Sequence, residues 1–344
     1  MEKTPAMIPR LPNPEYRPAW QSMLAEAVKS TDELLRMLEI DPASLNILPL
    51  ASNFPLRVPR GFIRRMAKGD INDPLLRQVL PLADEMQPGS GYLPDPLDEQ
   101  QAMQVPGLLQ KYRGRALLTT TGACAVHCRY CFRRHFPYSE ANPASGDWET
   151  AINWLKKNPD TREIILSGGD PLSLPDSRLH TLSKRLDELP WLNTLRIHTR
   201  LPIVLPERID AGFLSWVESQ KLQLVMVVHS NHPNEIDATV SDAMNRLKQA
   251  GVTLLNQSVL LRGINDSAAI LVRLSEVLFS AGVLPYYLHQ LDRVQGAAHF
   301  EVNDATAMEL MEEVRAALPG YLVPRLVREL PGEPGKTVIL HDTG

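Results

Sequence analysis

Three cysteines lie close together in the chain, and they are the only cysteines it contains. Cys124, Cys128 and Cys131 follow the spacing C-x3-C-x2-C. Thiolates are soft ligands, and thiolates this close in sequence converge when the backbone loops around a common centre, as in iron–sulfur and zinc sites. A structural zinc site takes four ligands, and no fourth cysteine is present. A [4Fe–4S] cluster held by three cysteines instead leaves one iron open to a small chelating molecule.

Two other interpretations of the cysteines are open. His127 or His135 could supply the fourth ligand of a Cys3His zinc site. A disulfide is disfavoured because three is an odd number. The start of the chain shows no charged stretch followed by an apolar one, so we expect a reducing, cytoplasmic setting.

The composition fits a folded, enzyme-sized protein. Of 344 residues, 44% are hydrophobic and 22% are charged, which is enough for one large α/β domain with an appendage. No apolar run approaches the roughly 18 residues of a membrane-spanning helix. The net charge is -4, and charges of both signs are mixed without a basic stripe. We therefore expect neither a membrane nor a nucleic acid as a partner.

Residues 1–109 differ from the rest and predict a mainly helical N-terminal segment. Prolines are frequent near the start, and a capping-box pattern begins at Ser30. An Asp-Pro pair at Asp73 predicts the start of another helix, expected to continue to Leu80. The Pro/Gly-rich stretch 86–98 is typical of a linker. No chemistry is apparent in this segment.

From Arg115 onward, short β-branched or leucine-rich runs alternate with polar-apolar helical patterns, which predicts a parallel sheet with helical crossovers. Right-handed crossovers curl such a sheet, and ligands bind at the carboxyl ends of its strands. We therefore predict an α/β fold with a partial (β/α)6 TIM-like barrel over residues 110–333, whose first strand delivers the cysteine loop to the barrel mouth. The expected strands are 115–120, 163–167, 195–199, 222–229, 253–261 and 284–289, and the expected helices are 148–156, 177–189, 211–220, 235–250 and 268–281.

Polar residues follow several of the expected strands. Segment 167–170 reads Ser-Gly-Gly-Asp, and paired glycines let a backbone approach a ligand closely, although this sequence is also a common turn. Stretches 196–200, 229–233 and 256–265 carry arginine, histidine and amide side chains, each of which is ordinary at a strand end. Together they predict a cavity for a ligand that bears a phosphate or a carboxylate.

The cysteine spacing, with Tyr130 before the last cysteine, resembles that of the radical S-adenosylmethionine enzymes. From residue 113 to residue 340 the chain resembles the lysine 2,3-aminomutase family. By frequency alone Lys336, in its Gly/Pro-rich loop, would be a surface turn, but that loop resembles the one that carries the pyridoxal lysine of this family. The features that carry the resemblance are Arg115, the cysteine loop with Arg133, segment 167–170, Asn256-Gln257-Ser258, segment 286–292 with His299 and Phe300, and Gly335-Lys336.

The resemblance implies an isomerase that converts L-α-lysine to β-lysine with three cofactors: a [4Fe–4S] cluster, S-adenosyl-L-methionine and pyridoxal 5′-phosphate. The cluster and S-adenosylmethionine generate a radical that removes an unactivated hydrogen, and pyridoxal phosphate gives the migrating nitrogen a π bond. The implied residues are Cys124, Cys128 and Cys131 for the cluster; Ser167, Gly168, Gly169, Asp170 and His229 for cofactor binding; Arg115 and Gln257 for the phosphate; Lys336, in a tail at 334–344, for the cofactor aldehyde; Arg133 for the substrate carboxylate; and Asp292 and Glu329 for its distal ammonium.

Two features depart from the clostridial members of that family. No cysteine follows Cys131, so we expect the zinc that bridges their subunits to be absent. Glu329 stands where the catabolic enzyme has an aspartate. Short chains of this kind resemble the bacterial enzyme that supplies β-lysine to translation elongation factor P, which implies that factor and its lysine ligase as functional partners and a flavodoxin-type electron donor.

Alternatives from other classes have different requirements. A catabolic aminomutase acting on lysine or another amino acid would use the same scaffold. A glutamate aminomutase would need a cation where Asp292 and Glu329 place carboxylates, so charge disfavours it. A non-enzymatic zinc-binding or cluster-binding interaction protein would need neither Lys336 nor a barrel.

Overall fold

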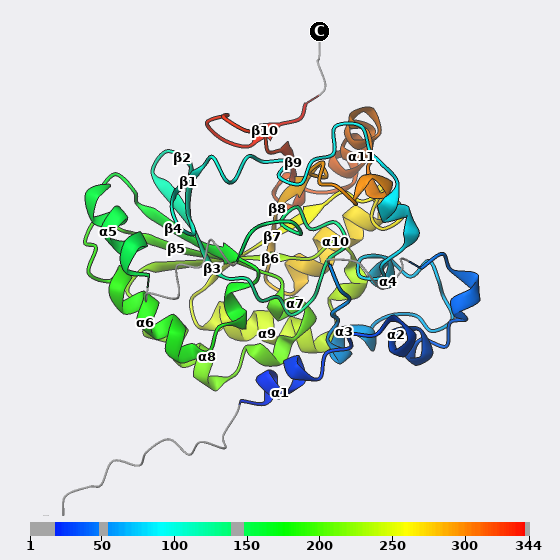
Figure 1. The fold of residues 1–344 in the computed structure, drawn as a ribbon, viewed down its shortest axis with the longest axis horizontal. Coiled ribbons are helices and arrows are strands. Elements are labelled where there is room, and N and C mark those ends of the chain that lie inside the picture. Colours follow the sequence, from blue (N-terminus) through cyan, green and yellow to red (C-terminus); the bar gives the residue numbers. More distant parts are fainter. Residues whose placement is uncertain (1–17, 48–53, 139–147, 341–344) are drawn as a thin grey trace, which may run out of the picture.

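One curved sheet positions the cysteine loop and the strand ends around it. The computed structural model describes residues 18–47, 54–138 and 148–340, so the first prolines and the last four residues of the expected tail lie outside the described part. The described strands form a ten-stranded sheet in which spatial order follows chain order from β1 to β10 (Figure 1). Because β1 and β10 are the two ends of that order, the sheet is a partial barrel, as the sequence predicted.

Seven consecutive strands of the sheet are parallel, where the sequence predicted six. The six predicted strands are confirmed, each to within two residues at its ends. The seventh, of four residues, is too short to show an alternating pattern. The parallel strands are β3 (Arg115–Thr121), β4 (Glu163–Gly168), β5 (Thr194–Thr199), β6 (Gln223–His229), β7 (Thr253–Val259), β8 (Leu284–His289) and β9 (Arg325–Arg328).

Short antiparallel strands extend both edges of the parallel region. β1 (Met103–Val105) and β2 (Leu108–Tyr112) precede β3. β10 (Thr337–Val338) folds back on β9, with Thr337 paired to Arg328. The expected boundary at residue 109 therefore falls inside β2.

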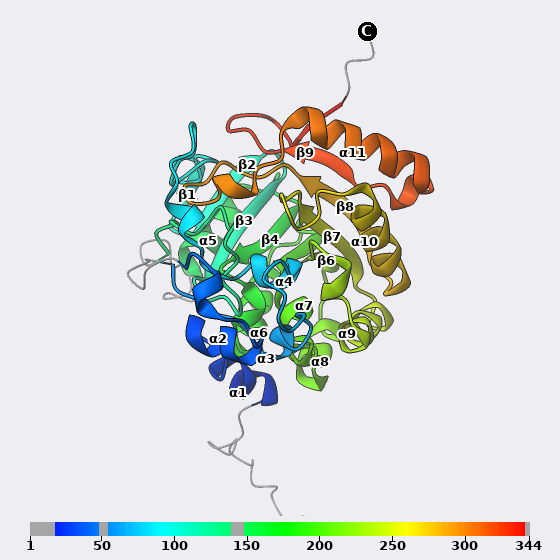
Figure 2. The ribbon, with the colours of Figure 1, turned by 90° about the vertical axis from the view of Figure 1, so that its right-hand side faces the viewer.

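Amphipathic helices connect the parallel strands, and Figure 2 shows α9, α10 and α11 along one flank of the sheet. Three of them begin at Asp210, Asp237 and Asn303, whose side chains accept a backbone N–H of the first turn. The five predicted helices are confirmed, whereas α7 and α11 were not predicted. The helices of this region are α5 (Glu149–Lys157), α6 (Asp176–Leu186), α7 (Leu201–Val204), α8 (Ala211–Glu218), α9 (Ala238–Gln249), α10 (Ala268–Ser280) and α11 (Asp304–Ala317).

The two faces of the sheet differ in chemistry because side chains alternate along each strand. One face packs in the hydrophobic core with the helices, through residues such as Leu118, Leu166 and Ile197. The residues of opposite parity form the inner face of the partial barrel. Polar members of that inner face are Arg115, Ser167, Arg196, His198, His229, Gln257 and His289.

The N-terminal segment packs on the barrel as part of the same hydrophobic core. Its helices α1, α2 and α3 lie beside one another at the end of the molecule away from β10 (Figures 1 and 2). The helix expected to run to Leu80 ends at Arg77, and the side chain of Gln78, which caps it, bonds with Glu235 and Tyr130. The helices are α1 (Ala19–Ala25), α2 (Thr31–Met37), α3 (Arg60–Ile63) and α4 (Pro74–Arg77).

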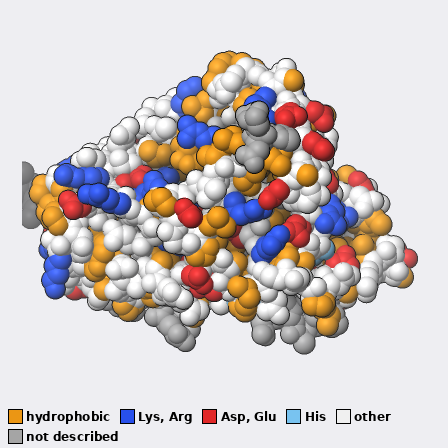
Figure 3. All heavy atoms as spheres, turned by 90° about the horizontal axis from the view of Figure 1, so that it is seen from above, with side chains coloured by type: hydrophobic (Ala, Val, Ile, Leu, Met, Phe, Trp, Pro, Cys, Tyr) orange, Lys and Arg blue, Asp and Glu red, His pale blue; other side chains and the backbone are white. Residues whose placement is uncertain are grey.

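The described helices include none that is long and apolar enough to cross a membrane. On the face in Figure 3, basic and acidic side chains alternate, with hydrophobic side chains between them. This mixing of charge agrees with the pattern expected from the sequence.

Candidate active site

The cysteine loop leaves β3 at the carboxyl end of the sheet. Cys124, Cys128 and Cys131 are half-buried free thiols, and the amide of Cys131 donates to the carbonyl of Cys128 in a tight turn. Burial and the nearness of the other thiols raise the pKa of Cys124, and burial raises that of Cys131 to about 11. No three His, Cys, Asp or Glu side chains of the described ranges converge closely enough to hold one metal ion. The ligands of a cluster bind separate irons, so they need not converge in that way.

The two histidines considered as zinc ligands have partners elsewhere. Nδ1 of His127 lies 2.7 Å from the carbonyl oxygen of Pro55, and its ring stacks on Phe54. Nε2 of His135 lies 3.3 Å from the carbonyl oxygen of Gln295. Each ring is thus engaged by a different part of the chain.

The paired glycines after β4 let the cysteine loop approach the strand end. A Cβ at Gly168 would lie 2.6 Å from the carbonyl oxygen of Thr121, and one at Gly169 would lie 2.3 Å from that of Ala123. Gly168 also has a φ of 122°, which only glycine adopts readily. The amide of Gly169 donates to Thr121 at 2.7 Å. These residues therefore fix the loop in addition to any contact with a ligand.

Asp170 is buried and its carboxylate is already used within the protein. One oxygen accepts from the hydroxyl of Thr199 at 2.7 Å and the other from the amides of Arg200 and Leu201. Burial raises its pKa in spite of these donors. Of the expected cofactor-binding group at 167–170, the backbone of the glycines is therefore better placed than this carboxylate to meet a ligand.

A row of five charged side chains runs from the cysteine loop to the C-terminal hairpin. Arg133 makes two hydrogen bonds to Glu99, at 2.6 and 2.7 Å. Lys111 lies between two carboxylates, 3.0 Å from Glu99 and 2.7 Å from Glu329. Lys336 ends the row, 2.8 Å from Glu329. Signs alternate along it, and the two lysines hold the pKa of Glu329 well below its usual range in spite of burial.

Three N–H groups of the Arg133 guanidinium are used within the protein. Its Nε and one Nη bond to Glu99, and the other Nη donates to the hydroxyl of Ser167 at 2.7 Å. A guanidinium has five N–H groups, so two remain for a substrate carboxylate. Arg133 can therefore still bind a substrate carboxylate, as expected, but not through the Nε–Nη2 edge, which bonds to Glu99.

Asp292 follows β8, and the charges of Glu329, Lys336 and Lys111 influence its pKa. Burial and the charge of Glu329 raise the pKa of Asp292 to about 7, against the opposite effects of Lys336 and Lys111. Two neighbouring carboxyl groups thus differ: Glu329 is ionised and neutralised by lysines, whereas Asp292 is poised between its two forms near neutral pH. An added cation would favour ionisation of Asp292.

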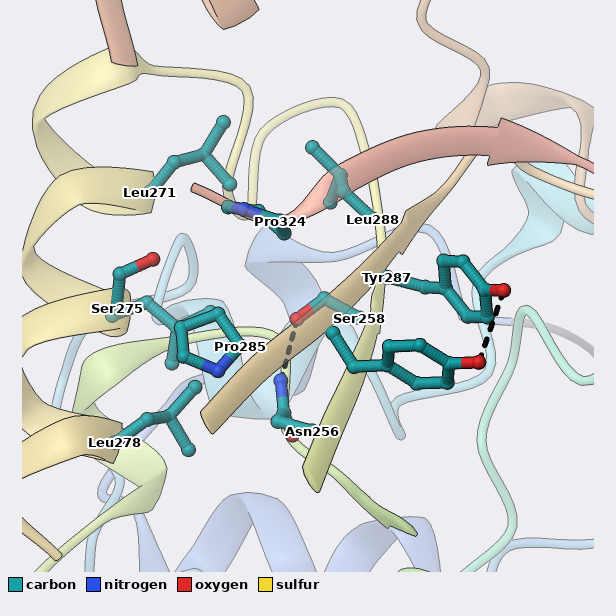
Figure 4. A pocket seen from close by; sticks show the side chains of 11 residues that line it. Asn256, Ser258, Leu271, Ser275, Leu278, Pro285, Tyr287, Leu288 and Pro324 are labelled. Atoms are coloured by element: carbon teal, nitrogen blue, oxygen red, sulfur yellow. Dashed lines mark hydrogen bonds between the residues drawn. The ribbon is translucent and has the colours of Figure 1, made fainter. Parts of the chain in front are cut away.

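An aromatic ring lies beside each of Arg115 and Lys336. The guanidinium of Arg115 lies 4.5 Å from the ring centre of Tyr112, and the ammonium of Lys336 lies 5.7 Å from that of Tyr287. Figure 4 shows Tyr287 directed away from the side where Leu271 and Leu278 of α10 line a small pocket. Gln257 of β7 is the register partner of Tyr287 in β8.

Several buried polar atoms of this region have no hydrogen-bond partner among the described residues: Nε2 of His198, Nε2 of His289 and Nε of Arg196. Buried polar atoms are nearly always paired in a complete site. The charges of Lys336 and Glu329 act on both histidines, whose pKa values burial lowers, so both rings are neutral. Unpaired groups beside Lys336 fit a ligand with several hydrogen-bonding atoms.

His229, at the end of β6, lies on the inner face of the partial barrel and contacts Tyr130. Burial and the charge of Arg200 lower the pKa of His229 to about 3, so the ring is neutral. The Tyr130 hydroxyl accepts from Arg200 and Asn231, and it lies 2.9 Å from Nε2 of His229 and 3.3 Å from Oε1 of Gln78.

No family model matches the chain. Its family is instead shown by known proteins with similar sequences. It is 51% identical to L-lysine 2,3-aminomutase of Escherichia coli (strain K12), over 94% of this chain and 95% of that protein. It is 45% identical to the protein of the same name from Haemophilus influenzae, over 96% of this chain and 98% of that one. The chain belongs to the lysine 2,3-aminomutase family. It is therefore an isomerase, as the resemblance predicted.

More distant relatives carry the same name. The L-lysine 2,3-aminomutase of Clostridium subterminale is 32% identical over 93% of this chain and 77% of that protein. Among solved structures, a radical SAM methyltransferase from Sphaerobacter thermophilus has a TM-score of 0.47 and 14% identity, covering 64% of this chain and 68% of that one.

The N-terminal segment, in which the sequence shows no chemistry, contacts the candidate site of this lysine 2,3-aminomutase family member. It supplies Glu99 to Arg133 and Gln78 to the group around Tyr130. Glu85 binds Arg129 and Arg134, which flank the last cysteine. A lone glutamate or glutamine in a Pro-rich stretch gives no sequence signal, because only the folded chain brings it to the cysteine loop.

Proposed function

We propose that this protein is a lysine 2,3-aminomutase that converts L-α-lysine to β-lysine and uses a [4Fe–4S] cluster, S-adenosyl-L-methionine and pyridoxal 5′-phosphate. The observation that carries the proposal is the carboxyl pair Asp292 and Glu329 beside the amine of Lys336, with Arg133 beyond Glu99 and Lys111. An amino acid held through its α-amine is recognised by its two ends. A carboxylate at one end and an ammonium at the other match this distribution of charge.

The residues present fit each of the three groups. Cys124, Cys128 and Cys131 offer three thiols in one loop, and Gly168 and Gly169 bring backbone groups next to it. An amine, an arginine and unpaired polar atoms suit an aldehyde that carries a phosphate. When bound, the cluster and S-adenosylmethionine supply hydrogen abstraction from an unactivated carbon, and pyridoxal phosphate supplies a π bond to the migrating nitrogen.

The chain itself orients the substrate through charge. Arrival of the substrate's distal ammonium favours the ionised form of Asp292, whose carboxyl releases its proton near neutral pH. Lys111 keeps Glu329 ionised when the amine of Lys336 is engaged elsewhere. Glu99 holds Arg133 by two bonds, so the guanidinium has one orientation in which to meet a carboxylate.

Direct assay with competing amino acids tests the substrate. The anaerobically reconstituted protein should convert L-lysine to a product with its amino group on the β carbon, detected by mass spectrometry after derivatisation. L-Glutamate should be a poor substrate, because its distal carboxylate would meet Glu329. Preference for glutamate, or no turnover together with no absorbance from bound pyridoxal phosphate, would contradict the proposal and favour the glutamate enzyme or the interaction protein, respectively.

We propose that the β-lysine is destined for a lysine of translation elongation factor P, with the lysine ligase of that factor acting next. Resemblance to the short bacterial enzymes supports this role, as does Glu329 in place of aspartate. Mass analysis of the factor from cells with the parent protein or with a Lys336→Ala variant tests it. Because α-lysine and β-lysine have the same mass, the lysine isomer released from the factor by acid hydrolysis is identified as well. β-Lysine is expected from the parent cells and not from the variant cells, and β-lysine from both would point to a catabolic lysine enzyme.

The cofactors also imply a setting and a partner. Thiols that hold a cluster must stay reduced, which supports a cytoplasmic location. The cluster takes one electron in each activation, which supports a flavodoxin-type donor as a partner. Turnover with reduced flavodoxin in place of dithionite would test that partner.

A further inference from the structure

Arg200 touches one of the three cysteines, although it lies 72 residues away in the chain. Its Nη1 lies 2.7 Å from the sulfur of Cys128 and 2.7 Å from the hydroxyl of Tyr130. Its Nη2 donates to Gln78 at 2.6 Å and to Glu235 at 2.9 Å. The side chain is only 6% exposed, so the contacts lie away from bulk water.

The position of Arg200 is fixed from both ends. Its backbone amide donates to the carboxylate of Asp170, the residue that follows the paired glycines. At the guanidinium end, Glu235 is itself held by the amides of Asn231 and His232 and by the side chain of Gln78. Arg200 therefore cannot turn away from Cys128 without breaking several buried hydrogen bonds.

We infer that Arg200 and Glu235 together set the reduction potential of the cluster held by Cys124, Cys128 and Cys131. This inference rests on the cluster proposed above. The [4Fe–4S]2+ form takes one electron from a low-potential one-electron donor, with no proton, and becomes [4Fe–4S]+. Hydrogen bonds to cluster sulfurs and nearby positive charge favour the form with more negative charge.

The two residues act in opposite directions because their charges are opposite. The guanidinium of Arg200 lies against Cys128 and stabilises the reduced cluster. Glu235 accepts from Nη2 of the same guanidinium, whereas Cys128 contacts Nη1, and the carboxylate partly cancels the charge of Arg200. A residue that only shaped the loop would not give effects of opposite sign.

Redox titration of four variants tests this inference, with the reduced cluster followed by electron paramagnetic resonance. At the midpoint potential of the parent, Arg200→Gln should lower the ratio of reduced to oxidised cluster at least tenfold, which is about 59 mV for a one-electron couple. Glu235→Gln should raise that ratio. The double variant, which removes both charges, should return toward the parent.

Arg208→Gln provides the matched control. Arg208 is also fully buried and bonds to Leu172 and Asp176, but it touches no cysteine. Its loss should leave the potential unchanged even if the protein becomes less stable. A shift as large as that of Arg200→Gln would mean that loss of any buried arginine alters the cluster, and would overturn the inference.

The remaining outcomes are also decisive. Unchanged potentials in both Arg200→Gln and Glu235→Gln, or shifts of the same sign, would overturn the role of the pair while leaving the cluster intact. If Arg200→Gln holds no iron, Glu235→Gln alone decides, since its carboxamide keeps the size of the side chain. A parent protein without iron and acid-labile sulfide would remove the cluster, and this inference with it.

Discussion

Lys336 and Glu329 face each other across the C-terminal hairpin, with the ammonium 2.8 Å from the carboxylate. The relationship follows from strand register, because Thr337 of β10 pairs with Arg328 of β9 and the next residues outward are 336 and 329. The hairpin thus places an amine and an acid together at the edge of the partial barrel. Lys111 reaches the same carboxylate from β2.

Lys336 is expected to be the lysine that binds pyridoxal phosphate. Reduction of the loaded protein with borohydride, followed by peptide mapping, should find the label on Lys336 and not on Lys111. Lys111 is the matched control because it is equally near Glu329 but lies between two carboxylates. Lys336→Ala should lose the label and Lys111→Gln should keep it; a label on Lys111 in the parent would reverse the assignment.

Removal of either carboxylate should weaken recognition of lysine. Breaking a buried charge pair costs about 3–5 kcal/mol, and each tenfold in rate is roughly 1.4 kcal/mol, so Asp292→Asn should lower kcat/KM about a hundredfold or more. Glu329→Gln should act in the same direction. Glu276→Gln, on the exposed side of α10, is the control and should match the parent. Normal rearrangement of lysine by either site variant would exclude the pair as the ammonium site.

The raised pKa of Asp292 predicts a pH dependence. Below about pH 7 its carboxyl is protonated in the free protein, and binding an ammonium then requires loss of that proton. The value of kcat/KM for lysine should therefore rise about tenfold per pH unit as pH approaches 7 from below, and then level off. Asp292→Asn should lack this limb. A parent profile that is flat between pH 5.5 and pH 8 would show that Asp292 does not titrate against the substrate.

Cys128→Ser should lose the cluster and keep the fold. The hydrophobic core lies between the sheet and the helices, so it does not depend on the metal. Iron and acid-labile sulfide, measured anaerobically, should fall together with activity, while far-ultraviolet circular dichroism stays near that of the parent. About one zinc per chain without sulfide in the parent protein would instead support a zinc site.

Glu85 should be a stability residue that holds the N-terminal segment to the cysteine loop. It accepts two buried hydrogen bonds from Arg129, at 2.6 and 2.5 Å, and a partly buried one from Arg134 at 2.5 Å. Glu85→Ala leaves two buried cations without this partner and should lower the free energy of unfolding by about 3–5 kcal/mol in denaturant titration. Glu33→Gln breaks an exposed pair with Arg60 and should cost about 1 kcal/mol or less. Equal effects would contradict a special role for Glu85.

Local chemistry and periodicity determined much of this protein from sequence alone. Cys124, Cys128 and Cys131 are recognisable because a cluster loop needs its thiols within a few residues. The six longer parallel strands and five of their helices were predictable because burial on one side imposes a pattern of period two or 3.6 on neighbouring residues. The role of Lys336 was predicted through a motif of its own loop, and the comparisons confirm the family.

Only the tertiary structure decided how the charges are paired. Arg133 meets Glu99 from 34 residues away, Lys111 meets Glu329 from 218, and Arg200 meets Gln78 from 122. Such pairs leave no periodic trace, because each partner is a single polar residue whose neighbour is chosen by the closure of the sheet. The short strands β1, β2, β9 and β10 escaped prediction for a related reason: they are set by their partners in the sheet, and two to five residues are too few to carry a pattern.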